Sequence, residues 1–259
     1  MLKIFDSHAH LNSRAYDEDR SEFLQSLKSQ GVVGVVECAT NANNIDRAVE
    51  LSKASPLVFA AVGVYPHDSA CYTDELEKKI AALYSENERV VAIGEAGLDY
   101  YYDGASHELQ KHVLERQLCL CEELNAPIIL HCRQATEDML SILKRHRVKG
   151  VMHCYSGSAE TAKELIKMGF YFGIGGSLTF KNNKKTPEAA RIIPMERILL
   201  ETDSPYLSPV PMRGSRNSPA YIKYIAEKLA EIKDVSPEQI CNTALNNAYN
   251  FFNIKEDLQ

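Results

Sequence analysis

The sequence predicts an α/β fold, a single (β/α)₈ TIM barrel with its active site at the carboxyl ends of the strands. Short apolar segments rich in β-branched residues alternate along the chain with segments whose apolar residues recur at helical spacing. There are eight of these apolar segments, the number of strands that closes such a barrel. Neither a linker nor a low-complexity tract interrupts the alternation, so residues 1–259 are expected to form one domain.

The predicted strands are short and almost continuously apolar. Such strands are typical of a parallel sheet that is covered on both faces. In chain order they span residues 3–5, 32–36, 57–62, 90–93, 128–130, 150–152, 170–174 and 198–200.

The predicted helices follow the strands and are marked by apolar residues three and four positions apart. Leu76, Ile80 and Leu83 show this spacing after the third strand. We expect glycines at the helix ends to adopt the left-handed conformation, and Ser-Pro pairs to cap and begin helices. The glycines are Gly31, Gly150 and Gly169, and the pairs are Ser218-Pro219 and Ser236-Pro237, the second forming a capping-box pattern with Gln239.

An open, doubly wound sheet is the alternative fold for the same alternation of strands and helices. In its dinucleotide-binding form, that fold carries a glycine-rich loop after its first strand. Here the first strand is followed by Asp6-Ser7-His8-Ala9-His10, which contains no glycine. The sequence therefore favours the barrel.

Charge and cysteine content argue against several classes of protein. The net charge of −6 disfavours a general nucleic-acid coat, so a polyanion would have to meet a local basic patch or a metal ion. No apolar run approaches the roughly 20 residues that cross a bilayer, and the first residues do not resemble a signal peptide. The seven cysteines lack a regular framework, as expected for reduced thiols. We expect a cytoplasmic protein with no membrane association and no obligate protein partner.

Histidines and carboxylates stand at the ends of five predicted strands. In a parallel barrel the active site lies at these ends, so the side chains are expected to converge. The residues are His8 and His10, Glu95, His131, His153, and Glu201 with Asp203.

Each of these residues alone has an ordinary explanation. In a chain with eight histidines, about a quarter of an H-x-H motif is expected by chance, and a lone His131 or His153 is more often a hydrogen-bonded core residue. Together they would crowd imidazoles and carboxylates into one small space, which lost hydration and repulsion disfavour unless a cation is present. Six ligand groups exceed the needs of one catalytic ion, so we expect two divalent ions sharing a carboxylate.

The chain resembles the TatD family of metal-dependent deoxyribonucleases, which belong to the amidohydrolase-type barrels. The motifs that carry the resemblance span nearly the whole chain in order. They are 5–10 (FDSHAH), 63–67 (GVYPH), 94–101 (GEAGLDYY), 130–133 (LHCR), 153–157 (HCYSG), 201–207 (ETDSPYL) and 213–217 (RGSRN).

The resemblance implies a role for each ligand residue. Asp203 and Glu95 would be the catalytic residues, Asp203 because a carboxylate beside the attacking water can take its proton and later protonate the leaving oxygen. The expected reaction is attack of a metal-activated hydroxide on phosphorus, and Asp6 and Glu201 would orient the ligands. One ion would be held by His8, His10 and Asp203, the other by His131 and His153, with Glu95 bridging both.

Further residues near the strand ends are predicted to bind substrate. Arginines suit phosphate because a guanidinium group can bind it with two hydrogen bonds. Tyr101 could stack on a nucleobase or close a hydrophobic lid, and His67 could face the substrate or pair with Asp68. The predicted set is His67, Tyr101, Arg133, Arg213 and Arg216, with Lys181, Lys184 and Lys185 forming a basic loop that could guide a nucleic-acid backbone or simply be solvated.

The sequence departs from the family pattern in how it would grip a substrate. Tyr65 stands where the family usually has a histidine, and Ser215 and Ser218 stand where a lysine and a glutamate are common. None of these departures removes a predicted metal ligand. Hydrolysis therefore remains the expected reaction, while the nature of the substrate is less constrained.

The expected function is that of a 3′-5′ exonuclease acting on the end of single-stranded DNA. An amide or ester hydrolase with the same centre, for example an aminoacyl-tRNA deacylase, is the alternative, because fold and metals do not choose the electrophile. A non-catalytic binding module is a third hypothesis, which the proton acceptor Asp203 disfavours. The imidazole-rich ligands suit zinc, manganese, cobalt or nickel, whereas magnesium, the family's usual ion, prefers oxygen.

Overall fold

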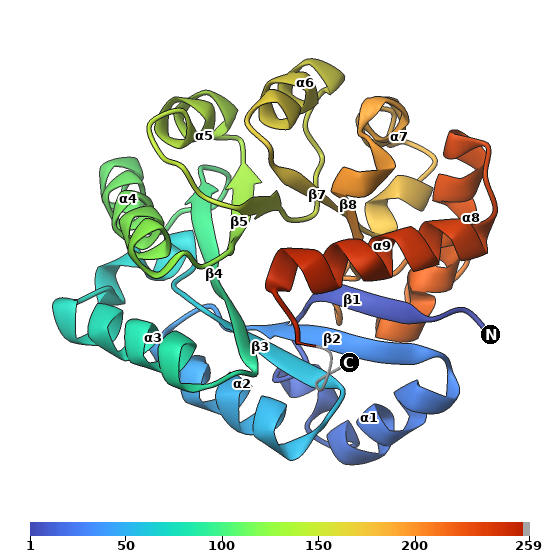
Figure 1. Ribbon diagram of the computed structural model, residues 1–259, viewed down its shortest axis with the longest axis horizontal. Helices are drawn as coiled ribbons and strands as arrows, with labels where there is room; N and C mark the ends of the chain where they lie inside the picture. The colour runs from blue at the N-terminus through green and yellow to red at the C-terminus, as the bar shows by residue number, and fades with distance from the viewer. Residues whose placement is uncertain (256–259) are drawn as a thin grey trace.

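The computed structural model describes residues 1–255 and confirms the predicted (β/α)₈ barrel. Eight parallel strands form one sheet, in which each strand pairs with the next one along the chain. Figure 1 shows the helices arranged around the outside of this sheet. The strands are β1 (Ile4–Ala9), β2 (Val32–Cys38), β3 (Val58–Val62), β4 (Val90–Asp99), β5 (Ile128–Arg133), β6 (Gly150–Met152), β7 (Tyr171–Ile174) and β8 (Ile198–Leu200).

A helix follows each strand, and two helices follow the last one. Their buried residues face the sheet, as the apolar spacing predicts: Leu76 and Ile80 are the buried residues of α3. The helices are α1 (Arg20–Ser29), α2 (Ala42–Ala54), α3 (Asp74–Glu86), α4 (His107–Leu124), α5 (Thr136–Leu143), α6 (Ala159–Lys167), α7 (Lys185–Ile192), α8 (Ile222–Lys233) and α9 (Pro237–Phe252).

The barrel closes where the end of β1 meets the segment that follows β8. Ala9 and Ser204 form a parallel bridge. The backbone N–H of His10 donates to the carbonyl of Ser204 at 2.7 Å, and the N–H of Asp203 donates to the carbonyl of His8 at 2.9 Å. These bonds bring two distant parts of the chain together and place Asp203 beside the two histidines.

Aromatic side chains fill the opposite end of the barrel, which α9 covers. Phe5, near the start of β1, stacks on Phe59 of β3 with ring centroids 6.0 Å apart and on Phe252 of α9 at 6.1 Å. Phe251 and Phe252 of α9 are both buried. In Figure 1, α9 lies across the barrel next to β1 and β8. The amino-terminal end is thus packed, and the carboxyl end is left for the polar residues.

Four strands, β1, β2, β4 and β5, extend further than the sequence predicts, β2 through Glu37 and Cys38. β1, β4 and β5 continue through polar residues, so that His8, Glu95 and His131 lie within strands instead of after them. In the extensions of β4 and β5, Asp99 pairs with Arg133 across the sheet. The backbone there belongs to the sheet although glycines and polar side chains interrupt the apolar run, so the predicted strands end too early.

Two of the three predicted left-handed glycines are confirmed. Gly31 and Gly169 have φ values of +89° and +85° at the ends of α1 and α6. The prediction for Gly150 is wrong, because this residue begins β6 and does not adopt a positive φ. Gly150 instead allows the Phe170 ring to pack closely against the backbone, since a Cβ at this position would lie 2.8 Å from Cδ1 of Phe170.

The predicted serine caps are present. The Ser236 hydroxyl accepts a hydrogen bond from the N–H of Gln239 at 3.1 Å at the start of α9. Ser218 caps a short 3₁₀ turn (Pro219–Tyr221) that leads into α8, so this helix begins later than the Ser-Pro pair suggests.

The seven cysteines are free thiols, in agreement with the expectation from their spacing. Within residues 1–255, no helix has the length and apolar character needed to cross a membrane.

Candidate metal centre

The predicted ligand residues meet at the carboxyl end of the barrel, around Glu95. This glutamate is only 2% exposed, and each of its carboxylate oxygens faces a different pair of histidines. The surrounding residues are His8 of β1 and His10 just after it, His131 of β5, His153 directly after β6, and Asp203 after β8.

On one side of the centre, His8 and His10 face one oxygen of Glu95. Their Nε2 atoms lie 3.4 and 3.5 Å from Oε2 of Glu95 and 3.2 Å from each other. Oδ1 of Asp203 lies 3.4 Å from Nε2 of His10 and 3.8 Å from Nε2 of His8. Asp203, in the segment after β8 that pairs with the end of β1, is therefore the fourth member of this group.

On the other side, His131 and His153 face the second oxygen. Nδ1 of His131 lies 3.1 Å from Oε1 of Glu95, and Nε2 of His153 lies 3.5 Å from the same atom. The two groups adjoin, because the rings of His8 and His153 stack with centroids 3.8 Å apart. Glu95 is thus the member that both groups share.

These distances fit metal coordination. Each set of three donor atoms, one from His8, His10 and Glu95 and one from Glu95, His131 and His153, lies within 4.8 Å of one another. A tetrahedral ion with bonds of about 2.1 Å separates its ligand atoms by about 3.4 Å. The observed separations of 3.2 to 3.5 Å in the first set match this value. The donor set and its spacing therefore suit a divalent cation on each side of Glu95.

Cys38 contacts the second ring nitrogen of both histidines in the first group. The carbonyl oxygen of Cys38 lies 3.0 Å from Nδ1 of His10, and the Sγ atom of Cys38 lies 3.4 Å from Nδ1 of His8. The carboxylate of Asp6 accepts hydrogen bonds from the backbone N–H of His8 at 3.2 Å and of Thr202 at 2.9 Å. These contacts fix both imidazoles with Nε2 turned toward the centre.

The histidines of the second group are held by carboxylates. Nε2 of His131 lies 3.1 Å from Oδ2 of Asp99, and the Tyr65 hydroxyl donates to the same oxygen at 2.9 Å. Oε1 of Glu201 lies 3.3 Å from Nδ1 of His153 and accepts a hydrogen bond from the N–H of Cys154. A carboxylate behind a ligating imidazole fixes its orientation and raises its basicity.

The electrostatics of the centre favour positive charge. Burial alone would raise the pKa of Glu95, yet His153 and His8 hold it well below its usual range. Burial likewise opposes protonation of His10 and His153, but Asp203 and Glu95 raise the pKa of His10 to about 9, and Glu201 and Glu95 raise that of His153 to about 10. The carboxylates thus create a negative electrostatic potential, which either protons on the histidines or a bound metal ion can neutralise.

Three of the predicted substrate residues lie at the rim of this centre. Nε2 of His67 is 3.8 Å from Oδ1 of Asp99 and has no hydrogen-bond partner among residues 1–255, whereas Asp68, its alternative partner, accepts from Asn41. The guanidinium of Arg133 lies over the exposed ring of Tyr101, 3.8 Å from its centroid. His67, Arg133 and Tyr101 therefore stay in the predicted substrate-binding set.

The two arginines after β8 already have partners within the chain. Both terminal nitrogens of Arg216 donate to Asp19, at 2.7 and 2.6 Å, and one also donates to the carbonyl of Ala15. The bidentate face of Arg216 is thus occupied by a carboxylate, and its predicted role in substrate binding stays a prediction. Arg213 donates to the carbonyl of Ser208 at 3.1 Å and lies over the Phe180 ring, so its predicted role stays a prediction.

Sequence reasoning gave no role to several residues that the structure places at the centre. Asp99 was hidden because the predicted strand ends at residue 93, although it lies four residues beyond Glu95 on the same face of β4. Glu37 directly follows the second predicted strand and accepts hydrogen bonds from the N–H groups of Leu11 and Asn12 beside His10. Its position at a strand end, the criterion that identified the other carboxylates, also identifies it. Tyr206 carried no signal besides its proximity to Asp203; its exposed ring lies 6.2 Å from that of His10.

Comparison with known proteins agrees with this centre. Residues 5–253 match the family model described as TatD related DNase. The chain belongs to the TatD-related family. It is a hydrolase of the TatD type, and its cluster of histidines and glutamates can hold a metal ion, in agreement with the names of relatives as metal-dependent hydrolases.

Among TatD-related proteins, the chain is 44% identical to the "uncharacterized metal-dependent hydrolase YabD" of Bacillus subtilis, over 97% of this chain and 99% of that protein. It is 32% identical to the "3′-5′ ssDNA/RNA exonuclease TatD" of Pantoea vagans, over 97% of this chain and the whole of that protein. The crystal structure of the TatD homologue YJJV from Escherichia coli superimposes with a TM-score of 0.90 at 31% identity, covering 97% of this chain and 98% of that one.

Proposed function

We propose that this TatD-related hydrolase is a deoxyribonuclease that removes nucleotides from the 3′ end of single-stranded DNA, using two divalent ions. The observation that carries the proposal is the position of Arg133. Arg133 lies two residues after His131, its guanidinium is 3.8 Å from the ring centroid of Tyr101 and 4.7 Å from that of Tyr102, and it forms no ion pair within residues 1–255. An unpaired guanidinium beside a metal centre suits a phosphate group, and exposed tyrosines suit a stacked base.

The name of one relative also supports a nuclease. The Pantoea vagans protein is named as an exonuclease on single-stranded DNA and RNA, and it matches this chain over its whole length. The shape of the barrel mouth adds to this support, because a recessed centre admits a strand end more easily than a duplex. The cytoplasmic location and the single domain over residues 1–259 stay predictions.

The residues of the centre would have different roles in hydrolysis. Divalent ions bound there would lower the pKa of water and neutralise charge on the phosphoryl oxygens. Asp203, whose side chain is 17% exposed, would take the proton of the attacking water and return one to the leaving oxygen. Glu95 would be the ligand shared by the two ions, while Arg133 and His67 would contact the phosphate from the rim of the centre.

The donor set bears on which ions are used. Four imidazoles and two carboxylates suit zinc, manganese, cobalt or nickel better than magnesium, which prefers oxygen ligands. We therefore expect activity with at least one of the former ions at concentrations where magnesium gives less.

The test is hydrolysis of single-stranded DNA by metal-stripped protein, repeated after adding back each divalent ion. A strand labelled at its 5′ end should shorten in single steps, while a 3′ label should leave first as a mononucleotide. Glu95→Ala should abolish both signals because it removes the shared ligand. If the protein binds metal but leaves DNA intact, the deoxyribonuclease proposal fails, and ester and amide substrates such as aminoacyl-tRNA become the ones to assay. A matched RNA strand distinguishes the two nucleic acids.

A further inference from the structure

A pocket of about 380 Å³ opens directly beside the metal centre, between the ends of β5 and β6 and the helices that follow them. We call it the β5–β6 pocket. Its walls include His153 and Cys154, and His153 also faces Glu95 at 3.5 Å. The same imidazole is thus the wall between the pocket and the centre, so a group in the pocket would adjoin a group held at Glu95.

The inner part of the pocket is apolar and the outer part is polar. Met139, Met152 and Leu165 line it and are only 1%, 4% and 1% exposed, so they form a closed floor. Thr136 and Lys185 also line it and are exposed, which places them toward solvent. Such a combination of an apolar floor and a few polar groups is typical of a small-molecule site, and the volume is near the lower end for such sites.

The charge of the pocket is unusual for this acidic chain. Arg133 and Lys185 line it, but no aspartate or glutamate does. Neither cation forms an ion pair within the part of the chain that the structure describes. An anion that enters the pocket would therefore meet two positive charges without having to displace a carboxylate.

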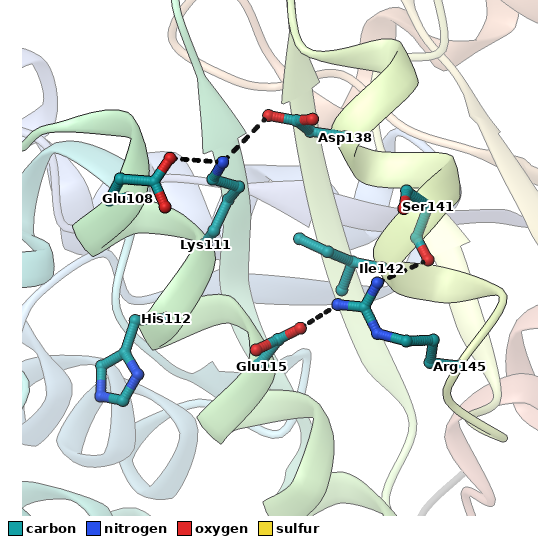
Figure 2. Close-up of a pocket in the computed structure, with 8 residues that line it drawn as sticks. All are labelled: Glu108, Lys111, His112, Glu115, Asp138, Ser141, Ile142 and Arg145. Carbon is teal, nitrogen blue, oxygen red and sulfur yellow. Dashed lines mark hydrogen bonds and ion pairs between the residues drawn. The ribbon is translucent and has the colours of Figure 1, made fainter.

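A second hollow on the surface provides a contrast. It lies between α4 and α5, has a volume of about 340 Å³, and is drawn in Figure 2. There Lys111 lies 2.6 Å from Glu108 and 3.5 Å from Asp138, and Arg145 is paired with Glu115. Its lysine and arginine are already paired with carboxylates, and none of the ligand histidines lines it, so it has no excess positive charge to offer a ligand.

We propose that the β5–β6 pocket receives the terminal nucleotide of the strand, with the base on the apolar floor and the phosphate between the metal centre and the cations Arg133 and Lys185. This inference rests on the proposed function, which it makes more specific. A pocket of this volume, closed by Met139, Met152 and Leu165, has space for one nucleoside and not for a continuing strand. It would therefore make the enzyme release single nucleotides from an end.

Two pairs of variants test the pocket. Thr136→Trp places a large ring in the pocket, and Ser141→Trp places the same ring on another exposed position of α5, outside the pocket. Lys185→Ala removes one lining cation, and Lys163→Ala removes an exposed lysine of α6, which does not line the pocket. The probe is thymidine 5′-monophosphate, whose binding to the metal-loaded protein is measured by calorimetry, with inorganic phosphate as the second probe.

We expect Thr136→Trp to weaken binding of the mononucleotide about tenfold or more because it occupies the space of the base. Lys185→Ala should weaken it about two- to fivefold, as for one exposed charge pair. Ser141→Trp and Lys163→Ala should bind it as the wild type does, and Thr136→Trp should leave the binding of inorganic phosphate unchanged. If Thr136→Trp does not fold, as judged by circular dichroism, the lysine pair decides.

Two results would overturn the inference. One is equal affinity of all four variants for the mononucleotide. The other is an equal loss of mononucleotide and phosphate binding in Thr136→Trp, which would place its effect at the metal centre. Both results are distinguishable from failure of the proposed function. If the variants lose mononucleotide binding as expected but the wild type does not cut DNA, the pocket is supported and the nuclease proposal fails. If the wild type cuts DNA but the variants bind the mononucleotide equally, the nuclease proposal is supported and the pocket inference fails.

Discussion

Asp99 lies directly behind His131, with its Oδ2 atom 3.1 Å from Nε2 of the imidazole. The other ring nitrogen, Nδ1, faces Glu95 at the same distance of 3.1 Å. Asp99 is completely buried, and Tyr65 donates a hydrogen bond to the same oxygen that faces the imidazole. His131 is thereby fixed with Nδ1 as the atom that faces the centre.

Replacing Asp99 with asparagine should weaken metal binding while leaving the fold intact. The neutral amide would no longer select the ring tautomer that leaves Nδ1 free, and the loss expected for such a partner of a ligand histidine is about 10- to 100-fold in metal affinity. Competition with a chelating indicator measures it. Asp138→Asn is the matched control, because Asp138 contacts Tyr100 and Lys111 outside the centre. Equal affinity in the two variants would contradict the role of Asp99.

The histidine ligands could be predicted from the sequence because barrel topology sends every strand end to the same place. His8, His131 and His153 each follow an apolar segment, so their convergence depends only on the strand order. Asp99 could not be predicted in this way, because Gly94 and Glu95 interrupt the continuous apolar run that defines the predicted strand, which therefore ends before it.

The contacts of the arginines were beyond sequence reasoning for a different reason. Arg216 and Asp19 are far apart in the chain, and nothing near either residue indicates that they pair. The same holds for the β5–β6 pocket, whose cations Arg133 and Lys185 come from different strand–helix units. Side-chain partners across a barrel depend on packing, which a local pattern does not specify.

Asp203→Asn should lower kcat by about 10²- to 10⁴-fold, the usual contribution of a general acid–base group. The amide keeps the shape of the side chain but cannot take a proton from water. Metal content is determined by elemental analysis, so that a loss of ions is separated from a loss of the proton acceptor. Asp234→Asn is a matched control, since Asp203 and Asp234 share a left-handed backbone, with φ of +58° and +56°, and Asp234 lies at the end of α8. Turnover that persists in Asp203→Asn would remove the assigned role.

Metal binding should release protons and should strengthen as pH rises. In the metal-free protein, the neighbouring carboxylates raise the pKa of His10 to about 9 and that of His153 to about 10, so both imidazoles hold a proton at pH 7. A ligating nitrogen must lose that proton, so affinity should increase by about tenfold per pH unit for each proton released, up to the pKa of the group. Titration with manganese at pH 6.5 to 8.5, in buffers of different ionisation enthalpy, measures both effects. Affinity that does not change over this range would mean that the histidines are already neutral.

Gly173→Ala should destabilise the protein and disturb the second half of the centre. Gly173 lies in β7 against the buried carboxylate of Glu201, and a Cβ there would lie 2.5 Å from Cδ of that side chain. Glu201 cannot move freely, because it holds His153 and the backbone of Cys154, so the expected cost is about 1–3 kcal/mol. Gly175→Ala is the control: a Cβ there would lie 3.6 Å from the backbone of Glu201, an ordinary contact, and should change stability by less than about 0.5 kcal/mol. Urea unfolding of the metal-free proteins gives both values. Equal stability of the two variants would show that Glu201 has room to shift, and would weaken the argument that it holds His153 in a fixed orientation.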